Sequence, residues 1–271
     1  MHLRIWGPGE APTIFMVHGW GDTSASFQFV VDELQRGWRV IAPDWRGFGQ
    51  SQWNEGTYWY PDYFADLDAL LGHYSPEEPV RLVGHSMGGT IASVYTGIRP
   101  ERVVRFINLD GGGLRRPPHS EAPGRVRKWL GQVTGERRFR VYSDRAEFAE
   151  RLRRDNPRLT AERAAFLAAE VTVACDGGVR FAIDPAHYWR NPVYYQIDDA
   201  MAAWREATAP VLWVTARDSF VTKLLEESPE DFNARLACFR DLRYVMLEDC
   251  GHNMHHDQPA QVARMIEEFF G

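Results

Sequence analysis

The sequence predicts an α/β protein in which a mostly parallel central sheet is flanked by helices and carries a helical cap insertion. Six short apolar runs have the length and composition of buried parallel strands, and they span residues 13–17, 39–42, 80–83, 103–109, 211–214 and 244–247. Helices are predicted between or after these runs at residues 62–71, 90–98 and 258–270. Such an alternation is typical of a parallel sheet that is covered on both faces.

The alternation breaks between Gly111 and Ala209. Residues 111–160 hold twelve Arg and one Lys against six Asp and Glu, a net charge of +7 in a chain whose total is −6. Helices are predicted here at 144–154 and 160–170, the second with Thr160 as its N-cap. We therefore expect a core formed by residues 1–110 and 210–271 and a cap formed by residues 111–209. The cap would lie over the C-terminal ends of the strands, where such sheets bind ligands.

Composition narrows the class of protein. The chain has 271 residues, 44% of them hydrophobic, and three cysteines without a close pair. An odd number of unpaired cysteines favours free thiols in a reducing compartment. The N-terminus lacks an apolar leader, and no run is long enough to span a membrane. The negative net charge disfavours a nucleic-acid partner. We expect a cytoplasmic protein, a monomer or a homodimer, that acts on a small molecule.

Residues 84–89 read Gly-His-Ser-Met-Gly-Gly and lie between an apolar run and a predicted helix. This strand-turn-helix context is typical of a nucleophile elbow, in which glycines two residues on either side of the serine leave room for a tight turn. Ser86 is the predicted nucleophile. The same pattern also occurs as an ordinary glycine turn at a helix start, so the interpretation depends on partner residues elsewhere.

A serine hydroxyl needs a base to take its proton and a carboxylate to orient that base. His252 follows the last predicted strand and is the predicted base. Asp218 follows the strand at 211–214 and produces the order Ser, Asp, His, so we expect it to be the acid. Asp110, which ends the strand at 103–109, is the alternative acid. For His85, beside the nucleophile, we favour a packing or loop-fixing role.

Four motifs taken together resemble the α/β-hydrolase superfamily: His18-Gly19-Trp20, the loop at 44–51, residues 84–89, and Gly251-His252 followed by His255 and Pro259. The resemblance covers nearly the whole chain. It implies a member of the serine-nucleophile branch with a helical cap and esterase-like activity. By position, the backbone N–H groups of Trp20 and Met87 would form the oxyanion hole.

These observations favour a serine hydrolase that cleaves a carboxylic ester through an acyl-enzyme, without a cofactor. Alternatives on the same residues are a C–C bond hydrolase, a thioesterase or a lactonase, and a less favoured one is a slow-turnover ligand-binding receptor. We expect Trp20, Trp189 and Tyr194 to contact the substrate. The cluster of His252, His255, His256 and Asp257 matches no zinc-binding spacing, so no metal is expected.

Overall fold

The computed structural model describes residues 1–193, 195–221 and 228–271. Within this part of the chain, seven strands form one sheet in the order β1-β3-β2-β4-β5-β9-β10. Only β1 runs antiparallel to its neighbour, β3, and the other pairs are parallel. The strands are β1 (Leu3–Trp6), β2 (Thr13–Val17), β3 (Arg39–Pro43), β4 (Val80–His85), β5 (Val103–Leu109), β9 (Val211–Ala216) and β10 (Leu242–Leu247).

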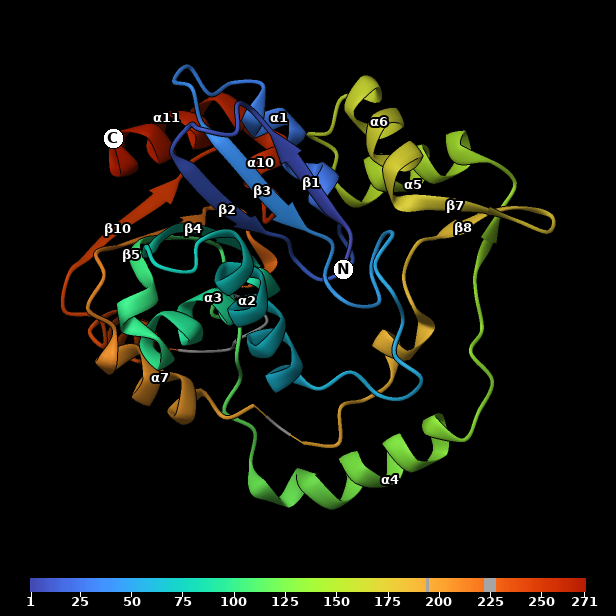
Figure 1. Cartoon of the computed structure of the whole chain (residues 1–271). Helices are drawn as coiled ribbons and strands as arrows, with labels where there is room; N and C mark the ends of the chain where they lie inside the picture. The colour runs from blue at the N-terminus through green and yellow to red at the C-terminus, as the bar shows by residue number, and fades with distance from the viewer. Residues whose placement is uncertain (194, 222–227) are drawn as a thin grey trace.

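Helices cover both faces of this sheet (Figure 1). One face packs against α2 (Tyr60–Tyr74), α3 (Met87–Ile98) and α7 (Ile197–Glu206), and the other against α1 (Gln28–Val31), α10 (Met254–Asp257) and α11 (Pro259–Phe270). A further helix, α9 (Pro229–Leu236), precedes β10. The predicted sheet with helices on both faces is confirmed.

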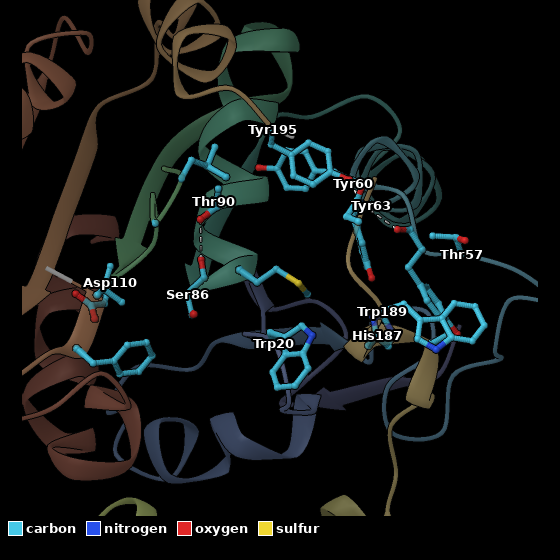
Figure 2. Close-up of a pocket in the computed structure, with 18 residues that line it drawn as sticks. Trp20, Thr57, Tyr60, Tyr63, Ser86, Thr90, Asp110, His187, Trp189 and Tyr195 are labelled. Atoms are coloured by element: carbon cyan, nitrogen blue, oxygen red, sulfur yellow. Dashed lines mark hydrogen bonds between the residues drawn. The ribbon is translucent and has the colours of Figure 1, made fainter. Parts of the chain in front are cut away.

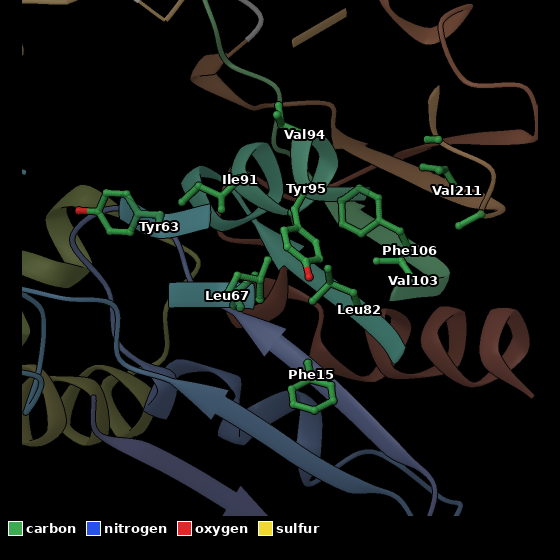
Figure 3. Packing of buried hydrophobic residues seen from close by; sticks show 14 of the residues in the cluster. Phe15, Tyr63, Leu67, Leu82, Ile91, Val94, Tyr95, Val103, Phe106 and Val211 are labelled. Carbon is green, nitrogen blue, oxygen red and sulfur yellow. The ribbon is translucent and has the colours of Figure 1, made fainter. Parts of the chain in front are cut away.

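The larger hydrophobic core lies between the sheet and the layer of α2, α3 and α7. Figure 3 shows Phe15, Leu82 and Phe106, from three different strands, on the side of the sheet that faces Leu67 of α2 and Tyr95 of α3. All five side chains are buried. Burying each side chain of this size contributes roughly 1.5–3 kcal/mol, so this layer holds the central strands in place.

Residues 111–209 depart from the alternating pattern, as expected, but they are not purely helical. Besides α4 (Ala122–Val133), α5 (Arg145–Asp155) and α6 (Ala161–Val171), they form a small antiparallel sheet of β6 (Val141–Tyr142), β8 (Gly178–Phe181) and β7 (Thr172–Cys175). Asp144 and Thr160 cap α5 and α6. Phe148 and Leu167 are buried in a cluster of this segment's own.

The end of the same segment packs on the core. In α7 the side chain of Trp204 is fully buried, and its indole N–H donates to Ser93 of α3 at 3.0 Å. The proposed cap therefore includes one helix that serves as a layer of the sheet domain.

The six predicted strands agree with the structure to within two residues at each end, and the three helices predicted outside the insertion agree to within three. The antiparallel edge strand β1 was not predicted. Every helix in the described ranges is too short or too polar to cross a lipid bilayer.

Contact between α3 and α7 is close enough to require a glycine. A Cβ atom on Gly97 would collide with the backbone carbonyl of Ala203, whereas a Cβ on Gly72 of α2 would meet nothing within 4 Å. We expect Gly97→Ala to lower the free energy of unfolding by about 1–3 kcal/mol through overpacking. The control Gly72→Ala should raise it by about 0.5–1 kcal/mol, because alanine favours a helix.

Urea denaturation of both variants measures these changes. A Gly97→Ala protein as stable as the wild type would mean that α3 and α7 do not pack as described.

Candidate active site

Ser86 lies in a strained turn between β4 and α3. Its backbone has φ 52° and ψ −117°, a conformation that costs a non-glycine residue about 1–3 kcal/mol. The turn is attached to the end of β5 by a hydrogen bond of 2.9 Å from the Ser86 N–H to the carbonyl of Leu109. A Cβ on Gly84 would lie 2.7 Å from the carbonyl oxygen of Gly88, so the crossing of strand and helix leaves no room for a side chain there.

His252 bridges Ser86 and a carboxylate. Its Nε2 lies 2.8 Å from Ser86 Oγ, and its Nδ1 lies 2.6 Å from Asp110 Oδ2. Because an ionised carboxylate can only accept, Nδ1 carries the ring proton and Nε2 is left to accept from the serine hydroxyl. This tautomer is the one in which His252 can remove a proton from Ser86.

Asp110 is held in place from several sides. It follows β5 with φ 54°, and its side chain is only 2% exposed. Its carboxylate accepts the hydroxyl of Ser219 and lies 3.4 Å from the backbone N–H of Ala216. These contacts satisfy a buried charge that would otherwise be costly.

The structure corrects the expected position of Asp218. Its side chain is 49% exposed and forms an ion pair with Arg158 at 2.5 Å, whereas His252 Nδ1 contacts Asp110, the alternative acid. The reason is the strand order: β5 lies directly beside β4, so a residue at its end emerges next to Ser86. After β9 it is Ser219, and not Asp218, that turns toward the site.

The loop after β2 lies against the nucleophile. His18 Nε2 accepts the backbone N–H of Trp45 at 2.9 Å, so its Nδ1 must donate to the carbonyl of Gly19, 2.7 Å away. A Cβ on Gly19 would lie 2.9 Å from the Cβ of Ser86. His18 thereby fixes the peptide that joins Gly19 to Trp20, and with it the direction of the Trp20 N–H.

Met87 is the first residue of α3. The first N–H groups of a helix have no partner within it and carry the positive end of the helix dipole. The Met87 N–H is therefore available as a donor beside Ser86.

His85 supports the loop that carries His252. Its Nε2 donates to the backbone carbonyl of His252 at 2.9 Å, and the ring is 2% exposed. Burial lowers the pKa of His85 to about 4, so the ring is neutral at pH 7. This contact agrees with the loop-fixing role expected for His85.

A cavity of about 330 Å³ extends from Ser86 under the insertion. Figure 2 shows Asp110 and Ser86 toward one end of it and His187, Trp189 and Thr57 at the other. The lining is largely aromatic and includes Tyr58, Tyr60, Tyr63, Tyr195 and Phe220. Trp189 lies in the wall as expected, and Tyr194 falls outside the described residues.

A second cavity of about 260 Å³ adjoins the first at Trp20 and reaches His252. Its walls are more polar and include Asp22, Arg151, Asp155 and Asn156. Trp20 lines both cavities, is 45% exposed, and packs edge-on against Tyr188 at 5.1 Å. The candidate nucleophile and base therefore lie between two spaces of different polarity.

A buried carboxylate of the insertion is hydrogen-bonded to the core beside the first cavity. Asp184 is fully buried and accepts Arg137 at 2.8 Å and the Tyr58 hydroxyl at 2.7 Å. The Arg137 guanidinium lies 5.5 Å from the Trp189 ring centre, where a cation is attracted to the aromatic face. The ion pair between Arg137 and Asp184 therefore helps to position Trp189 in the wall of the first cavity.

Several residues of the site were not chosen from the sequence. Ser219, Phe220 and the α2 residues Tyr60 and Tyr63 belong to no motif. The dense aromatic stretch at 58–63, which includes the start of α2, is a signal that could have pointed to the two tyrosines. Position after a strand pointed to His252, but it offered both Asp218 and Asp110 for the carboxylate beside it. It could not identify residues that reach the cavity from helices.

The largely buried His187 gives the site a pH-dependent stability. Its ring stacks between Phe48 and Tyr58, at 4.0 and 3.7 Å, and burial lowers its pKa to about 3. Between that value and the unfolded pKa near 6.5, the unfolded chain binds more protons, so stability falls as the pH drops through this window. We expect the protonation of His187 in the unfolded chain to lower the free energy of unfolding by on the order of 3 kcal/mol between pH 7 and pH 4.

Urea unfolding of His187→Gln at both pH values tests this, with the exposed His119→Gln as control. The free energy of unfolding of His187→Gln should change less between the two pH values than that of the wild type. Parallel profiles would show that His187 titrates normally in the folded chain.

With this geometry established, comparison with known proteins places the chain in a family. It is 28% identical to a serine hydrolase-like protein of Danio rerio, over 98% of this chain and 83% of the relative. It is also 28% identical to a 3-hydroxybutyrate-oligomer hydrolase of Cupriavidus necator, over 100% and 93%. A thioesterase domain from the curacin biosynthetic pathway superposes with a TM-score of 0.87 at 26% identity, covering 98% of this chain and 94% of the domain. The family model for the alpha/beta hydrolase fold matches residues 12–259, and the chain therefore belongs to the α/β-hydrolase family.

Proposed function

We propose that the protein is a carboxylesterase that hydrolyses a small ester through an acyl-enzyme on Ser86. The observation that carries this proposal is the continuous hydrogen-bonded chain from Ser86 through His252 to Asp110. It joins a nucleophile, a base and a carboxylate in the arrangement that acyl transfer requires. A hydrolase of this family with that arrangement needs no cofactor for ester cleavage.

In the first step Ser86 Oγ attacks the ester carbonyl while His252 Nε2 takes its proton. The imidazolium that forms is stabilised by the carboxylate of Asp110, which itself stays ionised. His252 then returns the proton to the leaving alcohol, and the C–O bond of the ester breaks. A water deprotonated by His252 attacks the acyl group, releases the acid and restores Ser86.

The tetrahedral intermediates carry a negative oxygen, for which we propose the N–H groups of Trp20 and Met87 as donors. The hydrogen bond from His18 to Gly19 and the helix start at Met87 support this assignment. Each donor of this kind contributes roughly 3 kcal/mol to the stabilisation of the transition state. His18 acts as a positioning residue for one of them.

The two cavities could hold the two parts of an ester substrate, its acyl group and its leaving group. We propose that the acyl group occupies the aromatic 330 Å³ cavity and the leaving group the more polar 260 Å³ cavity, with Trp20 and Trp189 contacting the substrate. These volumes lie at or below the lower end of ligand pockets, about 300–1,000 Å³, which favours a small molecule. We further propose a cytoplasmic location, since all three cysteines are free.

Thioester hydrolysis is the second candidate. The same attack by Ser86 would expel a thiol in place of an alcohol. The observation that favours it is the close superposition on a thioesterase domain, over nearly all of both chains.

Asparagine substitutions at the two aspartates test the assignment of the acid. Asp110→Asn keeps the size of the side chain but stabilises the wrong tautomer of His252, and we expect kcat on a p-nitrophenyl ester to fall about 10⁴-fold. The matched control Asp218→Asn removes an exposed ion pair and should keep the wild-type kcat. A loss with Asp218→Asn and none with Asp110→Asn would overturn the assignment.

A fluorophosphonate probe tests the nucleophile. We expect the wild type to be labelled on Ser86, as read by mass spectrometry of peptides, and Ser86→Ala to remain unlabelled while giving the same far-UV circular dichroism. A folded wild type that does not react would favour the ligand-binding alternative. The two candidate reactions are then compared by measuring kcat/KM on an ester and a thioester with the same acyl group. The substrate with the higher kcat/KM identifies the favoured reaction.

A further inference from the structure

A group of buried histidines extends behind His252, away from Ser86. The ring centre of His85 lies 4.8 Å from that of His252 and 4.2 Å from that of His255, and the rings of His255 and His256 are 4.0 Å apart. His255 and His256 come from α10, which follows the loop of His252. Beside them lies Asp22, from the loop that also carries Trp20.

Three of these rings have nitrogens without hydrogen-bond partners. In the described part of the chain, these nitrogens are Nδ1 of His85, both ring nitrogens of His255 and Nε2 of His256, and all three residues are buried. A neutral imidazole always has one N–H donor and one lone pair. Leaving such a buried group unsatisfied is unfavourable, and an ion or water is a usual explanation in a native protein.

The spacing of the ligand atoms fits a metal ion better than a hydrogen bond. His255 Nε2 lies 3.5 Å from Asp22 Oδ2, longer than a normal hydrogen bond. With bonds of about 2.0–2.1 Å, two ligands of a tetrahedral zinc ion are separated by about 3.4 Å. One ligand atom from each of Asp22, His255 and His256 lies within 4.8 Å of the others, so small side-chain movements would bring all three to one ion.

The charges also suit a cation. His255 and His256 are buried, and the neutral form of an imidazole keeps one ring nitrogen with a lone pair that can bind a metal ion. Asp22 supplies a negative charge. The neighbouring cation Arg163 donates to the backbone carbonyl of His256, at 2.7 Å, and lies over the ring of Phe29.

We propose that Asp22, His255 and His256 form a binding site for one divalent transition-metal ion, with zinc as the best fit. Two imidazoles and one carboxylate are a common zinc ligand set, and a water completes the tetrahedron. The second cavity gives access, because Asp22 and His256 both line it. The inference does not depend on the proposed ester hydrolysis.

A bound ion would join two loops of the candidate active site. Asp22 is two residues from Trp20, and His255 is three residues from His252. The metal would therefore fasten the loop with one proposed oxyanion donor to the loop with the proposed base. Since the site forms only in the folded chain, binding must stabilise the fold.

Untagged full-length protein, stripped with EDTA and dialysed, is titrated with ZnCl₂ and separately with CoCl₂. We expect one ion per chain by elemental analysis, and the visible absorption bands of four-coordinate cobalt. Zinc at 100 times its Kd should raise Tm by about 5–10 °C. X-ray absorption of the zinc-loaded wild type should show two imidazoles and oxygen ligands, and a zinc shell without imidazoles would overturn the proposal whatever the variants do.

The variants Asp22→Asn and His256→Gln, each checked by circular dichroism, should bind zinc at least about tenfold more weakly. His119→Gln, which removes an exposed histidine, should bind as the wild type does. Wild-type protein that takes up no stoichiometric zinc would contradict the proposal. So would folded Asp22→Asn and His256→Gln proteins with unchanged affinity.

Discussion

The close packing of the β4–α3 turn against the loop after β2 is the constraint on which the rest of the site depends. Ser86 sits at φ 52° because the strand and the helix cross with only glycines between them, and a Cβ on Gly88 would collide with the carbonyl of Val17. The same contact brings Gly19 against Ser86. Ser86, the start of α3 and the Trp20 peptide are thus positioned by one backbone arrangement, whose strain is balanced by the burial of the central strands around it.

Around this turn, neutral buried histidines hold the loops that are not part of the sheet. His18 orients the loop after β2, and His85 holds the backbone of His252. Because burial lowers the pKa of both rings, each acts as a fixed donor or acceptor and not as a charge. The same burial leaves His255 and His256 with free lone pairs beside Asp22, which is why a structural feature of the loops is also a candidate metal site.

The acid shows where reasoning from strand position reaches its limit. Asp110 and Asp218 both follow strands of the same sheet, and the order of residues along the chain favoured Asp218. The positions of the two aspartates depend on which strands are neighbours. Leu109 lies opposite His85 in the sheet, so Asp110 emerges beside Ser86. Asp218 forms an ion pair with Arg158 at the surface. The cluster of His252, His255, His256 and Asp257 matches no zinc-binding spacing, and the site proposed above depends on Asp22, which is far away in the chain and close only after folding.

From the sequence alone, the parallel sheet, its flanking helices, the turn at Ser86 and the histidine that contacts it could be predicted, because hydrophobic periodicity and glycine placement are local properties of the chain. Tertiary structure decided what depends on side chains from distant segments. It placed Asp110, and not Asp218, against His252, brought Tyr60 and Tyr63 of α2 to the cavity wall, packed α7 on α3, and placed Asp22 beside His255. Each of these contacts joins segments far apart in the chain, and no local pattern records them.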